Sequence, residues 1–183
     1  GPAVDLLAWS FKSSHHMDSP LDAPGLDEAL GARRPDARVL GVLHGDLDAG
    51  ASRYAPVSRR RLEDLSLDAC FLGHVHQPCA LSEMERPLGY LGSLVGLKPT
   101  ESGPRGPWRV EVPASGPVRP RQVALSPIRW ERFELPLEEE HAADEDRLHA
   151  HLEGWLRGRL EADESLRHEH LRAVVVRVEL TGR

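Results

Sequence analysis

Cysteine is nearly absent from this sequence, whose 183 residues hold only Cys70 and Cys79. Two cysteines are too few for a disulfide framework, so we expect both to be reduced thiols. The sequence also lacks any run of about eighteen apolar residues and any amino-terminal signal-peptide pattern, which leaves membrane insertion and secretion without support. We therefore expect a cytoplasmic protein with no membrane partner.

An excess of basic residues is lacking as well. The formal net charge of −6 argues against a protein that coats nucleic acid. The charge is unevenly distributed, because residues 98–132 hold seven Lys/Arg against three Glu, whereas residues 134–170 hold twelve Asp/Glu against four Arg. The simplest interpretation is two solvated surfaces of opposite charge.

Three short apolar runs predict buried strands, at residues 3–11, 38–43 and 69–72. The second and third runs lead directly into Gly-containing turns that carry His44 and His74. Residues at the ends of strands can line a cleft. The pattern of strand, turn and histidine therefore occurs twice.

The rest of the chain predicts further strands and helices. We expect a polar loop from His15 to Gly25 and a short helix beginning after Ser58. Apolar residues at helical spacing predict an amphipathic helix over residues 144–164, followed by a strand over residues 172–180. Gly and Pro interrupt the middle part, where we predict antiparallel strands at residues 88–91, 108–112, 118–125 and 128–135.

Three histidines near glycines stand out: His44, His74 and His76. A single such histidine is usually structural, but neutral imidazoles are common metal ligands and three together predict a metal site. In an extended segment, His74 and His76 would leave the same face about 7 Å apart. They could then hold one metal between them, or one each of a metal pair about 3.5 to 4 Å apart.

The segments at residues 43–45, 54–56, 68–76 and 90–93 resemble, in order and spacing, the later half of the calcineurin-like metallophosphoesterases. The SbcD-type DNA double-strand-break repair nucleases are the most similar group. Gly73-His74-Val75-His76 is the most specific match. The likeness extends from about Val39 onward, and residues 103–112 and 128–130 resemble the stretch that leads to that group's capping domain.

The resemblance implies an α/β fold: part of a two-sheet sandwich flanked by helices, followed by a partial α+β capping domain. Residues 1–127 would form the second half of the phosphoesterase domain, and residues 128–183 the beginning of the DNA-binding cap.

The implied activity is metal-dependent phosphodiester hydrolysis by a DNA exonuclease or endonuclease in double-strand-break repair. By the same resemblance, His44 and His74 would ligate one metal and His76 the other, with two manganese ions as cofactors. The implied partners are DNA, a coiled-coil ATPase of the chromosome-maintenance type and a second copy of the protein.

The sequence departs from the family because the motifs of the family's first half do not occur: an Asp-x-His pair, a bridging Asp after Gly, and Gly-Asn-His. Gly45-Asp46-Leu47-Asp48 resembles the bridging motif only superficially, since it directly follows His44. We therefore expect the chain to be a fragment that lacks half of the metal ligands. On its own, it should have no substantial nuclease activity.

Other residues could contribute more weakly to binding. His15 and His16 could touch substrate, although a hydrated pair in a loop is the simpler interpretation. Four arginines could contact DNA phosphates or could be ordinary surface charge. They are Arg105, Arg109, Arg119 and Arg121.

Three alternatives remain open. Cys70, His74, His76 and Cys79 could form a zinc site, although their spacing matches no common zinc finger. The chain could instead belong to a phosphoesterase that acts on nucleotides, cyclic nucleotides or phosphoproteins. It could also be a non-catalytic module that binds DNA or a protein partner.

Overall fold

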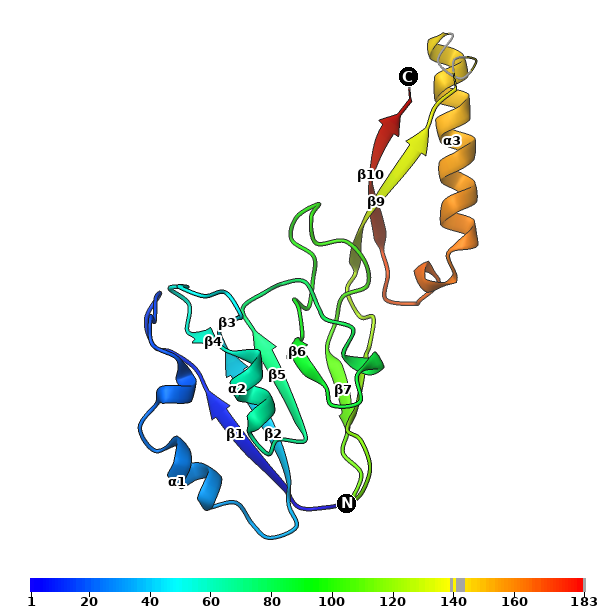
Figure 1. Ribbon diagram of the computed structural model, residues 1–183. Coiled ribbons are helices and arrows are strands. Elements are labelled where there is room, and N and C mark those ends of the chain that lie inside the picture. The colour runs from blue at the N-terminus through cyan, green and yellow to red at the C-terminus, as the bar shows by residue number, and fades with distance from the viewer. Residues whose placement is uncertain (139, 141–143, 183) are drawn as a thin grey trace. The chain divides into compact units, whose positions relative to one another are not determined.

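The computed structural model describes residues 1–138, 140 and 144–182, and shows a mixed α/β chain (Figure 1). The chain forms two compact units. Unit 1 consists of Gly1–Ser93 and Pro107–Val123, and unit 2 of Leu94–Gly106 and Ala124–Arg183. Among the described residues, no helix combines the length and the apolar character that crossing a membrane requires.

Unit 1 is built on a parallel four-stranded sheet with the order β1-β2-β5-β6. The apolar runs predicted as the first three strands are confirmed, because they form β1, β2 and β5. In register, Leu40 of β2 lies between Leu6 of β1 and Ala69 of β5. All four strands end at the same edge of the sheet. Their bounds are Val4–Trp9 for β1, Arg38–His44 for β2, Ala69–Gly73 for β5 and Leu88–Tyr90 for β6.

The apolar core of unit 1 lies on both faces of this sheet. Along β5, Cys70 and Leu72 belong to one buried cluster, while Ala69 and Phe71 belong to the other. This alternation is expected because successive side chains of a strand point to opposite faces. The first cluster is covered by α1 (Leu26–Gly31), α2 (Arg59–Asp64) and the 3-10 turn η1 (Pro20–Asp22).

The predicted antiparallel arrangement of the middle strands holds for one pair only. β7 (Trp108–Glu111) and β8 (Arg119–Gln122) pair antiparallel. Trp108 and Val110 of β7 pack against the second cluster, which includes Val118, just before β8, and Leu81 of η2 (Leu81–Glu83). β6 instead runs parallel to β5, and β9 (Ile128–Pro136) parallel to β10 (Ala173–Thr181). The antiparallel prediction was wrong for β6 and β9, because amino-acid composition indicates that a segment is a strand but not which strand it pairs with.

Short elements flank the sheet at the edge where the strands end. β3 (Asp46–Leu47) and β4 (Pro56–Val57) form a two-stranded parallel ribbon directly after β2. The helix predicted after Ser58 is confirmed as α2, and the Ser58 hydroxyl accepts a hydrogen bond from the Arg61 amide at 3.4 Å. The expected loop from His15 to Gly25 contains η1, and α1 begins where that loop ends.

Unit 2 contains a strand-helix-strand arrangement of β9, α3 (Glu145–Ala162) and β10. The predicted amphipathic helix is confirmed, because its large apolar residues are half-buried while nearly all its other residues are exposed. Trp155 of α3 meets Phe133 of β9 edge-on, with ring centroids 5.8 Å apart. The half-buried apolar residues of α3 are Leu148, Leu152, Trp155, Leu156 and Leu160.

Asp144 caps the amino terminus of α3, because its carboxylate accepts a hydrogen bond from the Arg147 amide at 2.8 Å. We expect Asp144→Ala to lower the free energy of unfolding of unit 2 by about 1 kcal/mol, the usual loss for such a cap. Urea denaturation followed by circular dichroism would measure it. Glu153→Ala is the control, since it removes only an exposed pair with Arg157 and should cost about 0.5 kcal/mol or less. Equal losses in the two variants would contradict the capping role.

Candidate functional site

The end of the parallel sheet brings two predicted histidines together. His44 is the last residue of β2 and lies opposite Gly73 of β5 in register, so His74 follows immediately beside it. The ring centroids of His44 and His74 are 5.5 Å apart, with the rings nearly perpendicular. Their proximity follows from two parallel strands that end at one edge of a sheet.

Gly73 allows this close approach. A Cβ atom at Gly73 would lie 2.8 Å from Nδ1 of His44, which is closer than side-chain atoms normally come. The absence of a side chain at Gly73 therefore leaves the space that the imidazole of His44 occupies. A larger residue at this position would displace the ring.

His74 has a backbone φ of +102°, which non-glycine residues rarely adopt. β5 ends at Gly73 and the chain bends at His74, so the extended geometry predicted for His74 and His76 is wrong. Such backbone strain costs on the order of 1 to 3 kcal/mol and is concentrated at functional sites. His76 lies in the following turn, where its carbonyl oxygen accepts a hydrogen bond from the Ser93 amide at 3.0 Å and its side chain is exposed.

Asp46 is a further residue of the site. Its Oδ1 lies 3.4 Å from Nε2 of His74, and its Oδ2 accepts a hydrogen bond from the Ser52 hydroxyl at 2.5 Å. The sequence interpretation gave Gly45-Asp46 only a superficial likeness to a metal-bridging motif. Asp46 could have been predicted as a site residue, because it directly follows the strand that ends in His44 and neighbouring strand ends bring such residues together.

Aromatic rings surround the histidine pair. Tyr54 packs against His74 with ring centroids 4.7 Å apart, and Phe11 meets His44 edge-on at 5.4 Å. The two loop histidines predicted to touch substrate also lie here. His15 stacks on Tyr54 at 5.4 Å, and His16 packs on Phe11 at 6.1 Å. The loop before η1 thus contributes to the same edge of the sheet.

The immediate surroundings favour a neutral imidazole at His44. Partial burial lowers the pKa of His44, and the nearby charge of His74 lowers it further. A neutral ring keeps a nitrogen lone pair available to a metal, whereas a protonated ring has none. The electrostatics of His44 therefore suit metal ligation, which itself remains a prediction.

The lowered pKa of His44 makes stability depend on pH. The folded state binds this proton less readily than the unfolded chain, so its effect is absent above the unfolded pKa of about 6.5. Stability is then lost as the pH falls from there through the folded pKa. We expect the wild-type protein to lose more unfolding free energy than His44→Gln between about pH 8 and pH 5. Urea denaturation at both pH values would measure this. Equal losses in the wild type and in His44→Gln would contradict the prediction. His149→Gln is the control variant.

The two cysteines do not support the zinc alternative. Cys70 lies in the buried core of unit 1, and burial raises the pKa of its thiol to about 12. Zinc binds the thiolate, which is unfavourable in such surroundings. Cys79 is half-buried, and its sulfur accepts a hydrogen bond from the Tyr90 amide at 3.4 Å.

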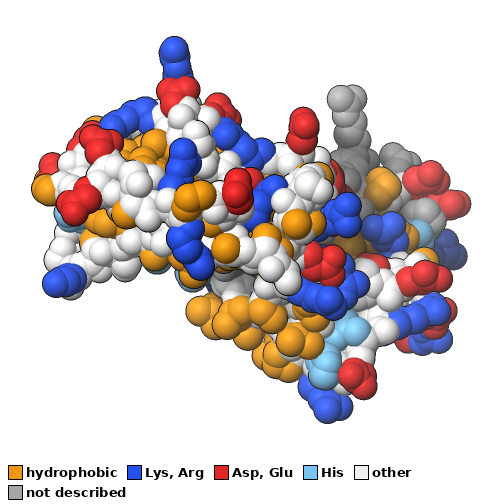
Figure 2. Space-filling model, turned by 90° about the horizontal axis from the view of Figure 1, so that it is seen from below, with side chains coloured by type: hydrophobic (Ala, Val, Ile, Leu, Met, Phe, Trp, Pro, Cys, Tyr) orange, Lys and Arg blue, Asp and Glu red, His pale blue; other side chains and the backbone are white. Residues whose placement is uncertain are grey.

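The four arginines predicted to contact DNA differ in exposure. Arg105 is 1% exposed and donates a hydrogen bond to the Ser102 carbonyl at 2.9 Å, so its prediction as a surface phosphate contact does not fit the structure. Arg109, Arg119 and Arg121 are exposed on β7 and β8, and Arg109 lies directly opposite Arg121. Basic and acidic side chains are interspersed over the face that Figure 2 shows. A DNA-binding role for the three exposed arginines stays a prediction.

The donor set of the site is partial. Within the described part of the chain, no group of three or more His, Cys, Asp or Glu side chains is arranged to hold a metal ion. His44 and His74 nevertheless fit as two imidazole donors, with the Asp46 carboxylate placed to orient one ring. Neither a family model nor a curated protein matches the sequence, so its likeness to the metallophosphoesterases remains a resemblance of motifs.

Proposed function

We propose that this chain forms part of a metal-dependent phosphodiesterase that acts on DNA, with His44, His74 and His76 as ligands of two manganese ions. The observation that supports this most strongly is the His44–His74 pair, with rings 5.5 Å apart at the carboxyl edge of a parallel sheet. When bound, the two cations would polarise the phosphate and lower the pKa of a bridging water.

The chain's own residues would hold and orient the donors. His44 presents a neutral ring, because burial lowers its pKa. Asp46 can accept a hydrogen bond from one ring nitrogen of His74, which fixes the tautomer and leaves the other nitrogen free to bind a metal. Tyr54 packs on His74 and limits its rotation. These contacts would prepare the two imidazoles before a cation arrives.

The proposal also includes the architecture, the kind of nuclease activity and the partners. The parallel sheet of unit 1 would be part of a two-sheet phosphoesterase sandwich, and β9, α3 and β10 the beginning of a cap that steers DNA toward the metals. The proposed activity is that of an exonuclease or endonuclease in double-strand-break repair, with a coiled-coil ATPase and a second copy as partners. The motif resemblance supports these assignments.

Manganese favours about six ligands, so two or three imidazoles leave most positions of two cations to water, substrate or other carboxylates. We therefore expect the 183-residue chain alone to degrade linear DNA in manganese barely faster than buffer does. Gel analysis of labelled duplex DNA would measure this. Robust degradation of DNA by the purified chain, lost in His44→Ala, would show that the chain does not lack essential metal ligands.

The proposed activity is tested on the natural polypeptide that carries these residues. Linear DNA, cyclic nucleotides and a phosphopeptide would be compared as substrates, with and without manganese. We expect manganese-dependent cleavage of DNA that falls at least about a hundredfold in His74→Ala and is unchanged in His149→Ala, which alters an exposed residue of α3. A preference for nucleotides or the phosphopeptide would favour another phosphoesterase. Absence of divalent-cation binding would favour a non-catalytic module.

A further inference from the structure

The hydroxyl of Tyr90, the last residue of β6, bonds to the chain on both sides of Asp46. It accepts a hydrogen bond from the Leu47 amide at 2.6 Å and donates one to the Gly45 carbonyl oxygen at 3.3 Å. These two groups belong to the two peptide units that flank the Cα atom of Asp46. Because each peptide unit is planar, the single hydroxyl restrains both φ and ψ of Asp46. Its donor and one of its acceptor sites are both used.

The backbone geometry of β3 explains why a side chain is needed there. The Asp46 amide donates to the Tyr54 and Ala55 carbonyl oxygens, just before β4, at 2.8 and 3.1 Å. Successive residues of a strand direct their amide and carbonyl groups alternately to opposite sides. Gly45 and Leu47 therefore present theirs away from β4, which is the one strand that pairs with β3 among the described residues. Gly45 is buried and Leu47 half-buried, so these backbone groups require a partner.

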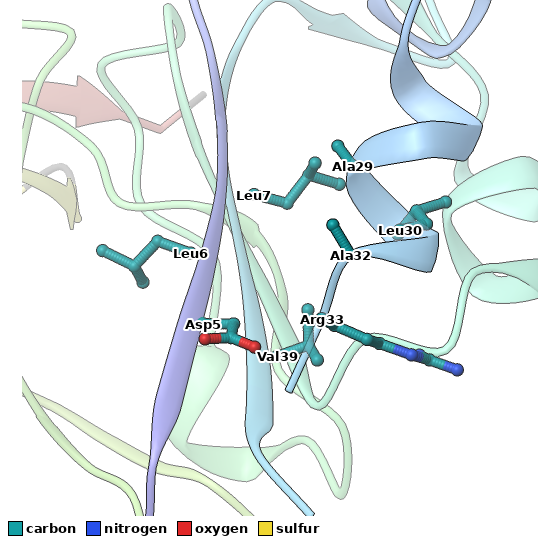
Figure 3. Close-up of a pocket in the computed structure, with 8 residues that line it drawn as sticks. All are labelled: Asp5, Leu6, Leu7, Ala29, Leu30, Ala32, Arg33 and Val39. Carbon is teal, nitrogen blue, oxygen red and sulfur yellow. The ribbon is translucent and has the colours of Figure 1, made fainter. Parts of the chain in front are cut away.

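Tyr90 is itself held in place by the sheet. It lies opposite Leu72 of β5 in register, and its carbonyl oxygen accepts a hydrogen bond from the Cys79 amide at 2.9 Å. Its ring packs against the first cluster of the unit 1 core, as does Leu7, which points toward α1 in Figure 3. Burial raises the pKa of Tyr90, so the hydroxyl stays protonated and can donate to the Gly45 carbonyl.

Asp46, which the hydroxyl restrains, is the residue that contacts His74. Its Oδ1 lies 3.4 Å from Nε2 of His74, and its Oδ2 accepts a hydrogen bond from the Ser52 hydroxyl. A carboxylate in this position favours a proton on Nε2 and leaves Nδ1 unprotonated. Rotation about the backbone of Asp46 would move the carboxylate away from the ring. The tautomer of His74 therefore depends on how firmly Asp46 is held.

We propose that Tyr90 is a positioning residue of the histidine site, whose hydroxyl fixes the backbone of Asp46 so that the carboxylate sets the tautomer of His74. Tyr90 acts through Asp46 and is not a proposed metal ligand. The inference rests on the proposed function only for the purpose of this arrangement, which is to keep Nδ1 of His74 available to a metal. The positioning itself is a property of the chain without a metal.

Tyr90→Phe tests the proposal, because it removes the hydroxyl and keeps the ring. The metal-free 183-residue chain, labelled with ¹⁵N-histidine, would be studied by NMR at about pH 8, where histidine is ordinarily neutral. We expect the Nδ1 and Nε2 signals of His74 to be widely separated in the wild type, as in a single tautomer. In Tyr90→Phe they should move toward each other as the second tautomer becomes populated. Hydrogen exchange of the Leu47 amide should become about fivefold faster or more, since its acceptor is lost.

Two further variants separate positioning from a general loss of stability. Leu67→Ala truncates a buried residue of the same core cluster just before β5, at the opposite end of that strand from the site. It should lower the urea midpoint at least as much as Tyr90→Phe does but leave the His74 signals unchanged. In the Asp46→Asn background, Tyr90→Phe should cause almost no further change in the His74 signals, because the hydroxyl acts through the carboxylate.

Titration with Mn²⁺ distinguishes this inference from the proposed function. We expect Tyr90→Phe to weaken Mn²⁺ binding about threefold to tenfold, less than His74→Ala does. Unchanged His74 signals in Tyr90→Phe, equal changes in Leu67→Ala, or an undiminished effect in the Asp46→Asn background would each overturn the positioning role. A wild-type chain that binds no Mn²⁺ but shows the expected change of tautomer in Tyr90→Phe would refute the metal site and support the positioning role.

Discussion

Replacing His44 or His74 with alanine should weaken the binding of Mn²⁺ to the 183-residue chain by about ten- to a hundredfold, the scale of loss on disturbing a metal site. The two rings lie 5.5 Å apart at the carboxyl edge of the sheet. Each substitution would leave a single imidazole of the pair, which holds its cation poorly. Isothermal titration calorimetry of the wild-type and variant chains would measure the change.

Two controls separate ligation from general disturbance of the loop. His149→Ala removes an exposed imidazole of α3 and should not alter Mn²⁺ affinity. Asp46→Asn keeps the size of the residue but weakens its contact with His74, 3.4 Å away, so it should cause a smaller loss than His74→Ala. Equal Mn²⁺ affinity in the wild type and both alanine variants would remove the His44–His74 pair from any metal site.

Leu72→Ala should lower the free energy of unfolding of unit 1 by about 3 kcal/mol, within the range known for buried leucines. Leu72 is 0% exposed, lies in the core cluster between β5 and the covering helices, and directly precedes Gly73 and His74. Its loss would leave a cavity beneath the proposed site. Urea denaturation followed by tryptophan fluorescence would measure the effect.

Leu6→Ala is the matched control for this substitution. Leu6 lies in the same sheet but is 65% exposed, so its truncation should change the free energy of unfolding by about 0.5 kcal/mol or less. If Leu72→Ala cost no more than Leu6→Ala, the core assigned to this face of the sheet would be wrong.

Hydrophobic patterning allowed most of the elements to be predicted. The run at residues 69–72 is fully buried in β5, and the helical spacing of Leu148, Leu152 and Trp155 appears as the half-buried face of α3. α1 was not predicted, because its six residues are too few to establish a helical period. The direction of β6 was predicted wrongly, because pairing depends on contacts distant in sequence.

The site could be predicted in part for related reasons. His44 and His74 each follow a buried strand, and parallel neighbours place such residues at one edge. The conformation of the turn could not be predicted, since the positive φ of His74 is imposed by its surroundings. The contact between Asp46 and His74 depends on that turn. Arg105 appeared to be a surface cation because charged side chains are rarely buried, yet it is 1% exposed.

The central claim, that His44 and His74 bind one divalent cation, is tested most directly by pulsed electron paramagnetic resonance of the Mn²⁺-loaded chain. Modulation from directly coordinated imidazole nitrogen should be strong in the wild-type protein and in His149→Ala. It should fall sharply in the His44→Ala, His74→Ala double variant, in which His76 is the only proposed imidazole ligand that remains. Bound Mn²⁺ without nitrogen modulation in the wild type, or with the same modulation in the double variant, would contradict the account.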